Sequence, residues 1–120
     1  MELDLTWSRN GGILIARPKG RIYSSNYLDW QTALERGISP DDTALLVDFT
    51  HVPYLSSAGL RVLLTTAKQF NEPGRAFAIC QLTRTVRKVL AASGFDRVVT
   101  VYESEDEAVA AITGDGGTDA

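Results

Sequence analysis

Residues 44–70, with the sequence ALLVDFTHVPYLSSAGLRVLLTTAKQF, decide the fold. The segment begins with four consecutive apolar residues, 44–47, which are followed by Asp48 and Phe49. A strand with one solvent-facing side alternates polar and apolar residues, so an unbroken apolar run predicts a strand covered on both faces. We therefore expect this strand to lie in the middle of a sheet.

An amphipathic helix is predicted directly after the serine pair Ser56 and Ser57. Polar residues at positions 61, 65, 68 and 69 take other directions around the axis than the apolar stripe, so one face packs and the other meets water. The stripe that we expect to pack inward consists of Leu60, Leu63, Leu64, Ala67 and Phe70.

Composition limits the kinds of function that are expected. The 120 residues are 44% apolar and 22% charged, which is ordinary for one globular domain. The net charge of −3 gives no basic surface for nucleic acid. The sequence contains neither a basic-then-apolar leader nor a run long enough to span a bilayer, so a cytoplasmic protein without membrane contact is predicted.

The single cysteine, Cys80, cannot form an internal disulfide and is expected to be a small buried hydrophobic residue. One cysteine and one histidine, His51, cannot build a metal framework. We therefore expect neither a metal nor a cofactor.

An N-terminal hairpin is predicted ahead of the central stretch. Residues 2–7 alternate polar and apolar side chains, which indicates a half-buried strand near an edge. The turn sequence Asn-Gly-Gly at 10–12 leads into a second strand at 13–17. Pro18 and Gly20 are expected to interrupt or end that strand.

The first helix is predicted between the serines at 24 and 25 and Gly37. Ser24 or Ser25 can cap its start, and Gly37 followed by Ile38 fits a Schellman ending. The inward stripe is expected to consist of Tyr27, Trp30 and Leu34, with Leu28 alongside.

Two further strands are predicted at 76–82 and 98–102. Between them, Thr83 is the expected N-cap of a helix, and Gly94 followed by Phe95 gives another glycine-plus-apolar ending. The residues of this helix that we expect to face inward are Val86, Val89 and Leu90.

The last helix is indicated by Ser104 and Glu107, which have the S-x-x-E spacing of a capping box. Residues 114–120 beyond it are expected to form a flexible tail.

Alternation of strands and helices predicts a single α/β domain over residues 1–113, with right-handed crossovers and a mostly parallel central sheet. The N-terminal hairpin adds an antiparallel piece, and about four helices are expected in all.

The sequence YLSSAGLRVLL, preceded by LLVDFTHVP and set in this order of elements, resembles the STAS domain of the bacterial anti-sigma factor antagonists. The sequence GRIYSSN at 20–26 resembles a second landmark of that family, the junction that enters the first helix. The resemblance extends over residues 3–112, and it implies the STAS fold for nearly the whole chain.

In that family the serine two residues before the glycine of this loop is the phosphoacceptor. The resemblance therefore implies Ser57 as the acceptor, with Ser56 as the competing candidate. Acidic residues that the family commonly carries near this site are replaced here by Ser56 and Tyr23. The residues that we expect to bind a partner are Tyr23, Ser24, Ser56, Ser57, Ala58, Gly59 and Arg61.

The resemblance also implies a function. Unphosphorylated antagonist binds an anti-sigma factor that is a serine kinase, and phosphorylation of the antagonist ends the binding and so controls sigma-factor-dependent transcription. A serine phosphatase is the expected third component. The alternative is a STAS scaffold subunit of a transporter or signalling complex that is never phosphorylated.

Physical reasoning favours such a switch at Ser57. Unpaired amides and the positive dipole end at a helix start tolerate an anion, while a phosphate adds nearly two negative charges to a surface that docks flush. Gly59 is expected to leave room for another backbone to approach closely. Leu60 is expected to hold the loop on the core.

An enzyme is not expected. A serine hydrolase needs a base close to its nucleophile, but the only histidine, His51, lies in the same loop and no G-x-S-x-G elbow is present. His51 is interpreted as a residue that fixes the loop, and Asp48 as a carboxylate bonded to nearby backbone donors.

Two charged segments have simple structural interpretations. The cations Arg84, Arg87 and Lys88 fit a solvated helix face, although a contribution to partner docking stays open. The acidic residues between 103 and 107 favour the N-terminus of the last helix.

Overall fold

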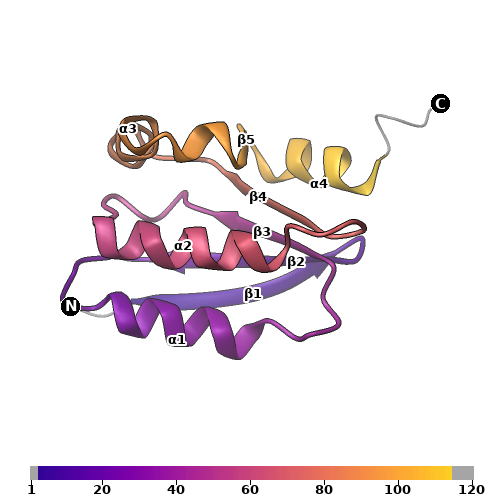
Figure 1. The fold of residues 1–120 in the computed structure, drawn as a ribbon, viewed down its shortest axis with the longest axis horizontal. Coiled ribbons are helices and arrows are strands. Elements are labelled where there is room, and N and C mark those ends of the chain that lie inside the picture. Colours follow the sequence, from indigo (N-terminus) through magenta and orange to yellow (C-terminus); the bar gives the residue numbers. More distant parts are fainter. Residues whose placement is uncertain (1–2, 115–120) are drawn as a thin grey trace.

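Strand β3, Ala44–Asp48, is the central strand of a five-stranded sheet with the order β1-β2-β3-β4-β5 (Figure 1). The computed structural model describes residues 3–114 of the chain. All five residues of β3 are buried, as the unbroken apolar run predicts. The prediction of a central strand is confirmed.

The predicted α/β architecture is also confirmed. Strands β1 and β2 pair antiparallel as the N-terminal hairpin, and β2, β3, β4 and β5 pair in parallel. Residues 115–120 of the predicted tail lie outside the described residues. The other strands are β1 (Asp4–Asn10), β2 (Ile13–Lys19), β4 (Ala76–Cys80) and β5 (Thr100–Tyr102), and the helices are α1 (Tyr27–Gly37), α2 (Ser57–Gln69), α3 (Arg84–Ser93) and α4 (Glu105–Thr113), with a 3₁₀ turn at Phe95–Arg97.

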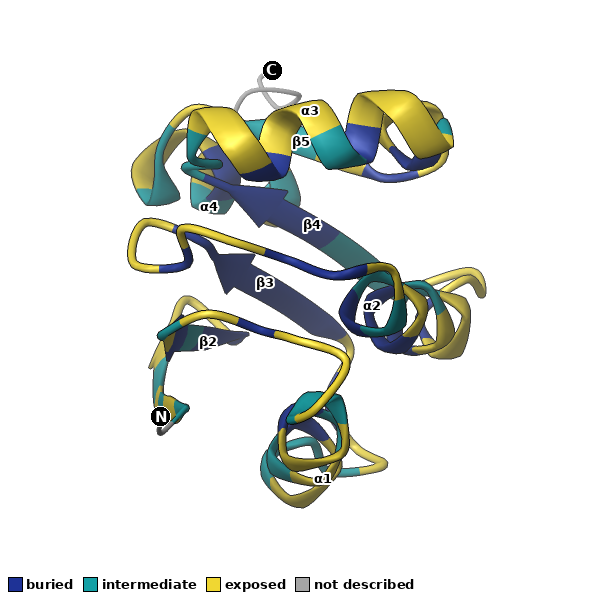
Figure 2. Cartoon of the chain, turned by 90° about the vertical axis from the view of Figure 1, so that its left-hand side faces the viewer, coloured by how far each residue is buried: buried dark blue, intermediate teal, exposed yellow. Residues whose placement is uncertain are grey.

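Alternate residues of the central strands pack into two separate cores. Leu45 and Val47 of β3 belong to the larger core, which α1, α2 and α3 complete. Leu46 belongs to the smaller core beneath α4. Figure 2 shows the middle strands buried between these helices. The sheet is therefore covered on both faces, as a strand without polar alternation requires.

Helix α1 begins later than the serines at 24 and 25 predict, because Asn26 is its N-cap. The Asn26 Oδ1 atom accepts a hydrogen bond from the Tyr23 amide at 2.6 Å, and its Nδ2 group donates to the Arg21 carbonyl at 3.0 Å. These bonds fix the turn into the helix. Within α1 the expected burial is confirmed for Trp30 but is wrong for Leu28, which is 59% exposed.

The predicted Schellman ending at Gly37 is wrong, since Gly37 does not have a left-handed backbone. The glycine is required there because a Cβ atom would collide with the indole ring of Trp7. In contrast, Gly94 at the end of α3 has a φ of 80° and donates to the Ala91 and Leu90 carbonyls, as predicted.

Strand β2 continues through Pro18 to Lys19, so the expected interruption at Pro18 is wrong. The parallel ladder between β2 and β3 covers only residues 14–16 of β2. Pro18 therefore lies beyond that ladder, where its missing amide hydrogen removes no bond to β3.

The buried stripe of α2 differs from the predicted one. The predicted Leu63 is buried, but Leu60, Leu64 and Ala67 are only partly buried. Thr66 is fully packed because its hydroxyl donates to the Val62 carbonyl at 2.9 Å. The most buried residues within the helix are Gly59, Val62, Leu63 and Thr66.

The predicted caps of the last two helices are confirmed. Thr83 Oγ1 accepts from the Val86 amide at 3.3 Å, and Ser104 Oγ accepts from the Glu107 amide at 3.0 Å. The Glu107 carboxylate accepts from the Glu103 amide at 2.7 Å, one residue before the position that a capping box predicts. Over residues 3–114, every helix is too short or too polar to cross a bilayer.

The two later strands are shorter than predicted. β4 ends at Cys80 because Gln81 has a left-handed backbone, with φ of 56°. β5 begins at Thr100 because the amides of Val98 and Val99 donate to the Phe95 carbonyl of the 3₁₀ turn and are not available to the sheet.

We predict that Gly59→Ala lowers the free energy of unfolding by about 1–2 kcal/mol. A Cβ atom at position 59 would lie 2.6 Å from Ile22 Cγ2 and 2.8 Å from Leu55 Cδ1. Overpacking of this kind costs about 1–3 kcal/mol, and alanine recovers up to about 1 kcal/mol of helix propensity. Urea denaturation measures the change, with the exposed Thr65→Ala on the same helix as control. Unchanged or higher stability for Gly59→Ala would contradict this packing.

Candidate functional site

Two connecting segments position the start of α2. The segment between β2 and α1 runs beside the segment between β3 and α2, at the end of the sheet that faces the viewer in Figure 2. Backbone bonds join them from Gly20 N to His51 O and from Ile22 N to Tyr54 O, both at 3.0 Å, and from Ser56 N to Ile22 O at 2.8 Å. Because Ile22 is also fully buried, the serine pair is fixed to the core.

The two serines have different environments. Ser56 is the N-cap of α2: its Oγ accepts from the Gly59 amide at 3.1 Å, and the residue is only 8% exposed. Ser57 is the first helical residue and is exposed. Within residues 3–114, no acceptor bonds the amides of Ser57 and Ala58, so they stay open beside the Ser57 side chain.

Gly59 serves the fold and does not leave room for a partner's backbone, so that expectation is wrong. The residue is buried, and the space that a side chain would need is filled by Ile22 and Leu55. Its carbonyl accepts from the Trp30 indole at 3.2 Å, which connects α2 to α1. Leu60, as expected, packs against the larger core.

An exposed aromatic pair lies next to the serines. The rings of Tyr23 and Tyr54 have centroids 5.5 Å apart, and both residues are more than one-third exposed. Ser24 and Arg61 are exposed as well, and Ala58 is half-buried. Most of the residues predicted to bind a partner are therefore accessible around the start of α2, while Ser56 and Gly59 are not.

His51 is exposed in the loop after β3 and contributes its carbonyl to the bond with Gly20. Among the described residues, no hydrogen bond connects its ring to Ser57. Asp48 accepts from both the amide and the hydroxyl of Thr50, as the local interpretation predicts. The arrangement presents a serine hydroxyl beside open amides and aromatic rings, which is suited to modification and contact.

Comparison with known families decides the classification. The sequence model of the STAS domain family matches residues 5–108, a range that includes nearly the whole sheet and its helices. The chain belongs to the STAS domain family. The resemblance carried by the serine loop is thus confirmed at the level of the family.

Two relatives of this STAS domain have names of the same kind. BtrV from Bordetella bronchiseptica, named as a candidate anti-sigma factor antagonist, is 33% identical over 91% of this chain and 94% of its own. An anti-sigma F factor antagonist from Paenibacillus polymyxa is 25% identical over the same shares of the two chains.

Solved structures agree on the fold. An anti-sigma factor antagonist from Mycobacterium paratuberculosis superposes with a TM-score of 0.83 at 20% identity, covering 92% of this chain and 93% of that one. Phosphorylated SpoIIAA from Bacillus gives 0.67 at 15% identity, covering 91% and 99%. A sulfate transporter family protein from Wolinella succinogenes gives 0.70 at 16% identity, covering 87% and 88%.

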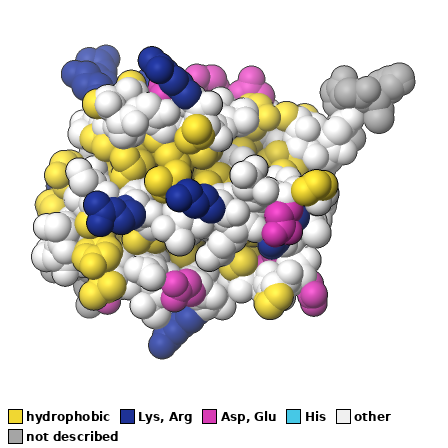
Figure 3. All heavy atoms as spheres, viewed as in Figure 1, with side chains coloured by type: hydrophobic (Ala, Val, Ile, Leu, Met, Phe, Trp, Pro, Cys, Tyr) yellow, Lys and Arg dark blue, Asp and Glu magenta, His cyan; other side chains and the backbone are white. Residues whose placement is uncertain are grey.

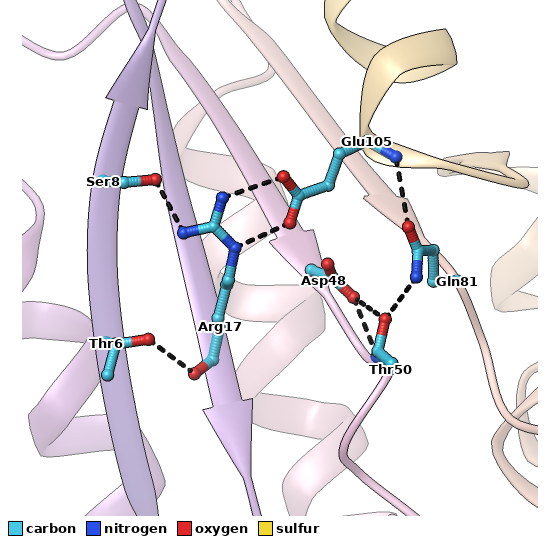
Figure 4. Close-up of polar contacts among 7 residues, drawn as sticks. All are labelled: Thr6, Ser8, Arg17, Asp48, Thr50, Gln81 and Glu105. Atoms are coloured by element: carbon cyan, nitrogen blue, oxygen red, sulfur yellow. Dashed lines mark hydrogen bonds and ion pairs between the residues drawn. The ribbon is translucent and has the colours of Figure 1, made fainter.

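The STAS domain also contains a polar network that the sequence did not predict (Figure 4). Arg17 of β2 donates from Nε to Glu105 Oε2 at 2.7 Å and from Nη2 to Oε1 at 2.8 Å. Its Nη1 donates to Ser8 Oγ at 2.7 Å. Gln81 donates to the Thr50 hydroxyl and accepts from the Glu105 amide. The network connects β1, β2 and the ends of β3 and β4 to the start of α4.

The charges in this network shift each other's pKa. The Arg17 guanidinium lowers the pKa of Glu105 to about 2, and the neighbouring Asp48 contributes. Burial raises the pKa of Asp48, with Glu105 adding to the effect. Arg17 and Glu105 are 88 positions apart, and no local pattern in the sequence marks them as partners.

Burial also raises the pKa of the Cys80 thiol to about 12, and the negative charges of Asp48 and Glu105 act in the same direction. The residue is fully buried beneath α4, as the sequence predicts. A thiol in this state supplies no nucleophile at neutral pH.

Two hollows on the surface differ in volume and in the residues that line them. A groove of about 710 Å³ lies between α2 and the edge of the sheet at β4 and β5, with Leu64, Phe77 and Val98 in its lining. Figure 3 shows apolar side chains gathered over this part of the surface. A smaller hollow of about 390 Å³ lies beside the loop of His51.

We predict that Glu105→Gln removes part of the pH dependence of stability on the acid side. The folded pKa of Glu105, about 2, lies below its ordinary value of 4.5, so its stabilisation is present above pH 4.5 and disappears as the pH falls toward 2. Urea denaturation at pH values between 7 and 2.5 measures this. The exposed Glu72→Gln is the control, and equal acid-side slopes for the wild type and Glu105→Gln would contradict the prediction.

We predict that Cys80 reacts with Ellman's reagent only as the protein unfolds. In native buffer the thiol is buried and protonated, whereas in denaturant it is accessible with an ordinary pKa. Absorbance at increasing urea should therefore follow the unfolding curve. Rapid reaction of the native protein would contradict the position of Cys80 beneath α4.

Proposed function

We propose that this STAS domain is an anti-sigma factor antagonist that acts in the cytoplasm without catalysing a reaction. In its unphosphorylated form it binds an anti-sigma factor that is also a serine kinase, which frees the sigma factor for transcription. Phosphorylation of Ser57 ends the binding, and a serine phosphatase restores it. The names of the two relatives described above support this assignment.

The observation that carries the proposal is the division of roles between the two serines. The Ser56 hydroxyl is occupied as a buried helix cap, while the Ser57 side chain is exposed at the first position of α2. A kinase brings its own nucleotide, metal ions and catalytic base, so the acceptor needs only exposure and correct placement. Its exposure at the first position of α2 supports Ser57 as the acceptor.

The surroundings of Ser57 explain why a phosphate can act as a switch without disturbing the fold. The amides of Ser57 and Ala58 are open, and the helix dipole favours an anion at this end. The same phosphate adds a charge of about −1.5 to −2 next to the exposed Tyr23 and Tyr54 rings. A partner packed on those rings would have to desolvate that charge, which weakens its binding.

The two positions that lack the family's acidic residues affect the contact surface. Ser56, which stands in place of one of these acidic residues, is buried and caps α2. Tyr23 is exposed and packs on Tyr54, so it supplies an aromatic contact where the family commonly has a charge. The proposed partner therefore meets an aromatic surface at this point, together with the exposed Ser24 and Arg61.

We predict that incubation with the cognate kinase and ATP adds one phosphate to the native protein and none to Ser57→Ala. Intact mass spectrometry and peptide mapping measure the modification. Thr65→Ala, which removes an exposed hydroxyl further along α2, is the matched control and should accept phosphate like the wild type.

A phosphate that maps to Ser56, or one that persists in Ser57→Ala, would contradict the proposed acceptor. No phosphate at all would favour the alternative, a scaffold subunit of a transporter or signalling assembly. In that case, affinity purification from the host should recover a transporter or scaffold protein in place of a kinase and a sigma factor.

A further inference from the structure

A hollow with two cations lies at the carboxyl ends of β2 and β3. Its lining includes Lys19 at the end of β2 and Arg21 just after it, Thr50 and His51 from the loop after β3, and Thr83 at the start of α3. All of its lining residues come from the described part of the chain, and none is a carboxylate. Its volume of about 390 Å³ is large enough for one or two acidic side chains.

The acidic residues Asp48, Glu103 and Glu105 make contacts with other residues. Asp48 is buried and accepts two hydrogen bonds from Thr50. Glu105 pairs with Arg17 at 2.7 Å, and Glu103 pairs with Arg87 at 3.5 Å. Within residues 3–114, neither Lys19 nor Arg21 forms an ion pair, so both charges are available to a partner.

The positive charge around this hollow is opposite in sign to the net charge of the whole chain. The net charge is −3, yet the exposed residues Lys19, Arg21 and Arg84 follow one another from β2 to the start of α3 around this hollow. Binding of nucleic acid depends on a larger excess of basic residues, so a few cations on an acidic protein fit a protein partner better.

The hollow lies a short distance along the chain from Ser57. Pro53 in its lining is four residues before Ser57, so the two lie at most about 14 Å apart along the chain. Tyr54, whose exposed ring packs on that of Tyr23, follows Pro53 directly in the chain. An interface of ordinary size, about 800 Å² per partner, covers both.

We infer that this hollow binds an acidic segment of the protein partner, with carboxylates of that segment pairing with Lys19 and Arg21. The inference rests on the proposed function, since it gives the chemistry of the surface that docks beside Ser57. The hollow adds affinity and salt dependence, while Ser57 supplies the switch. A partner with a basic docking surface would be repelled.

Hexaglutamate is a direct probe, because it carries the proposed chemistry and needs no kinase. NMR titration of the ¹⁵N-labelled protein at low salt should shift the amides of residues 19–21, 50–51 and 83. The double variant Lys19→Gln/Arg21→Gln should bind the peptide about tenfold more weakly, as expected for two exposed ion pairs. Raising the salt to 0.5 M should abolish the binding.

The matched control is Arg36→Gln/Lys68→Gln, which removes the same charge from the last turns of α1 and α2. It should bind hexaglutamate like the wild type. Equal weakening by both double variants, or shifts elsewhere on the surface, would overturn the inference. Tighter binding of a twelve-nucleotide oligothymidylate at the same residues would also overturn it and assign the hollow to nucleic acid.

The two proposals can fail separately. If Ser57 accepts no phosphate but hexaglutamate binds at the hollow, the docking of an acidic segment is supported and the phosphorylation switch is contradicted. If Ser57 is phosphorylated but hexaglutamate does not bind at the hollow, the phosphorylation switch is supported and the binding of an acidic segment is contradicted. Circular dichroism of each double variant establishes that it is folded before either result is interpreted.

Discussion

The burial of β3 on both faces is the constraint on which the rest of the structure depends. Its residues alternate between two cores, so helices must cover both sides of the sheet. Parallel neighbours on each side then bring the carboxyl ends of three strands to one edge. The loop after β3 leaves the core at that edge, and this is why the serine pair is placed beside the segment that enters α1.

The backbone bonds between the two connecting segments turn this edge into a defined surface. Ile22 and Leu55 are fully buried and hold the segments down, while Tyr23 and Tyr54 next to them point outward. Residues that anchor the segments in the core and residues that are exposed to a partner therefore lie next to each other in the chain. Ser56 and Ser57 follow the same division, since one closes the helix and the other stays available.

Much of the fold could be predicted from the sequence, because its determinants are local. The apolar run of β3, the caps at Thr83 and Ser104, and the left-handed Gly94 each depend on a few adjacent residues. The role of Gly37 could not be predicted, since it depends on Trp7 in a distant strand. The same holds for the pair of Arg17 and Glu105, whose contact exists only once α4 lies on the sheet.

The candidate site was predicted in outline and refined by packing. The serine loop and the family were recognisable, but burial alone separates Ser56 from Ser57 and assigns Gly59 to the interior. The hollow at Lys19 and Arg21 depends on two segments that only the folded sheet brings together. Patterns along the chain therefore locate the site, and the tertiary structure determines which of its residues are accessible.

The central claim is that one phosphate on Ser57 controls the binding of the partner. Isothermal titration calorimetry of the cognate anti-sigma factor kinase, with the untreated and the fully phosphorylated protein at equal ionic strength, tests it most directly. The account predicts that phosphorylation weakens binding at least about tenfold, which corresponds to about 1.4 kcal/mol. Equal affinities for the two forms would contradict it.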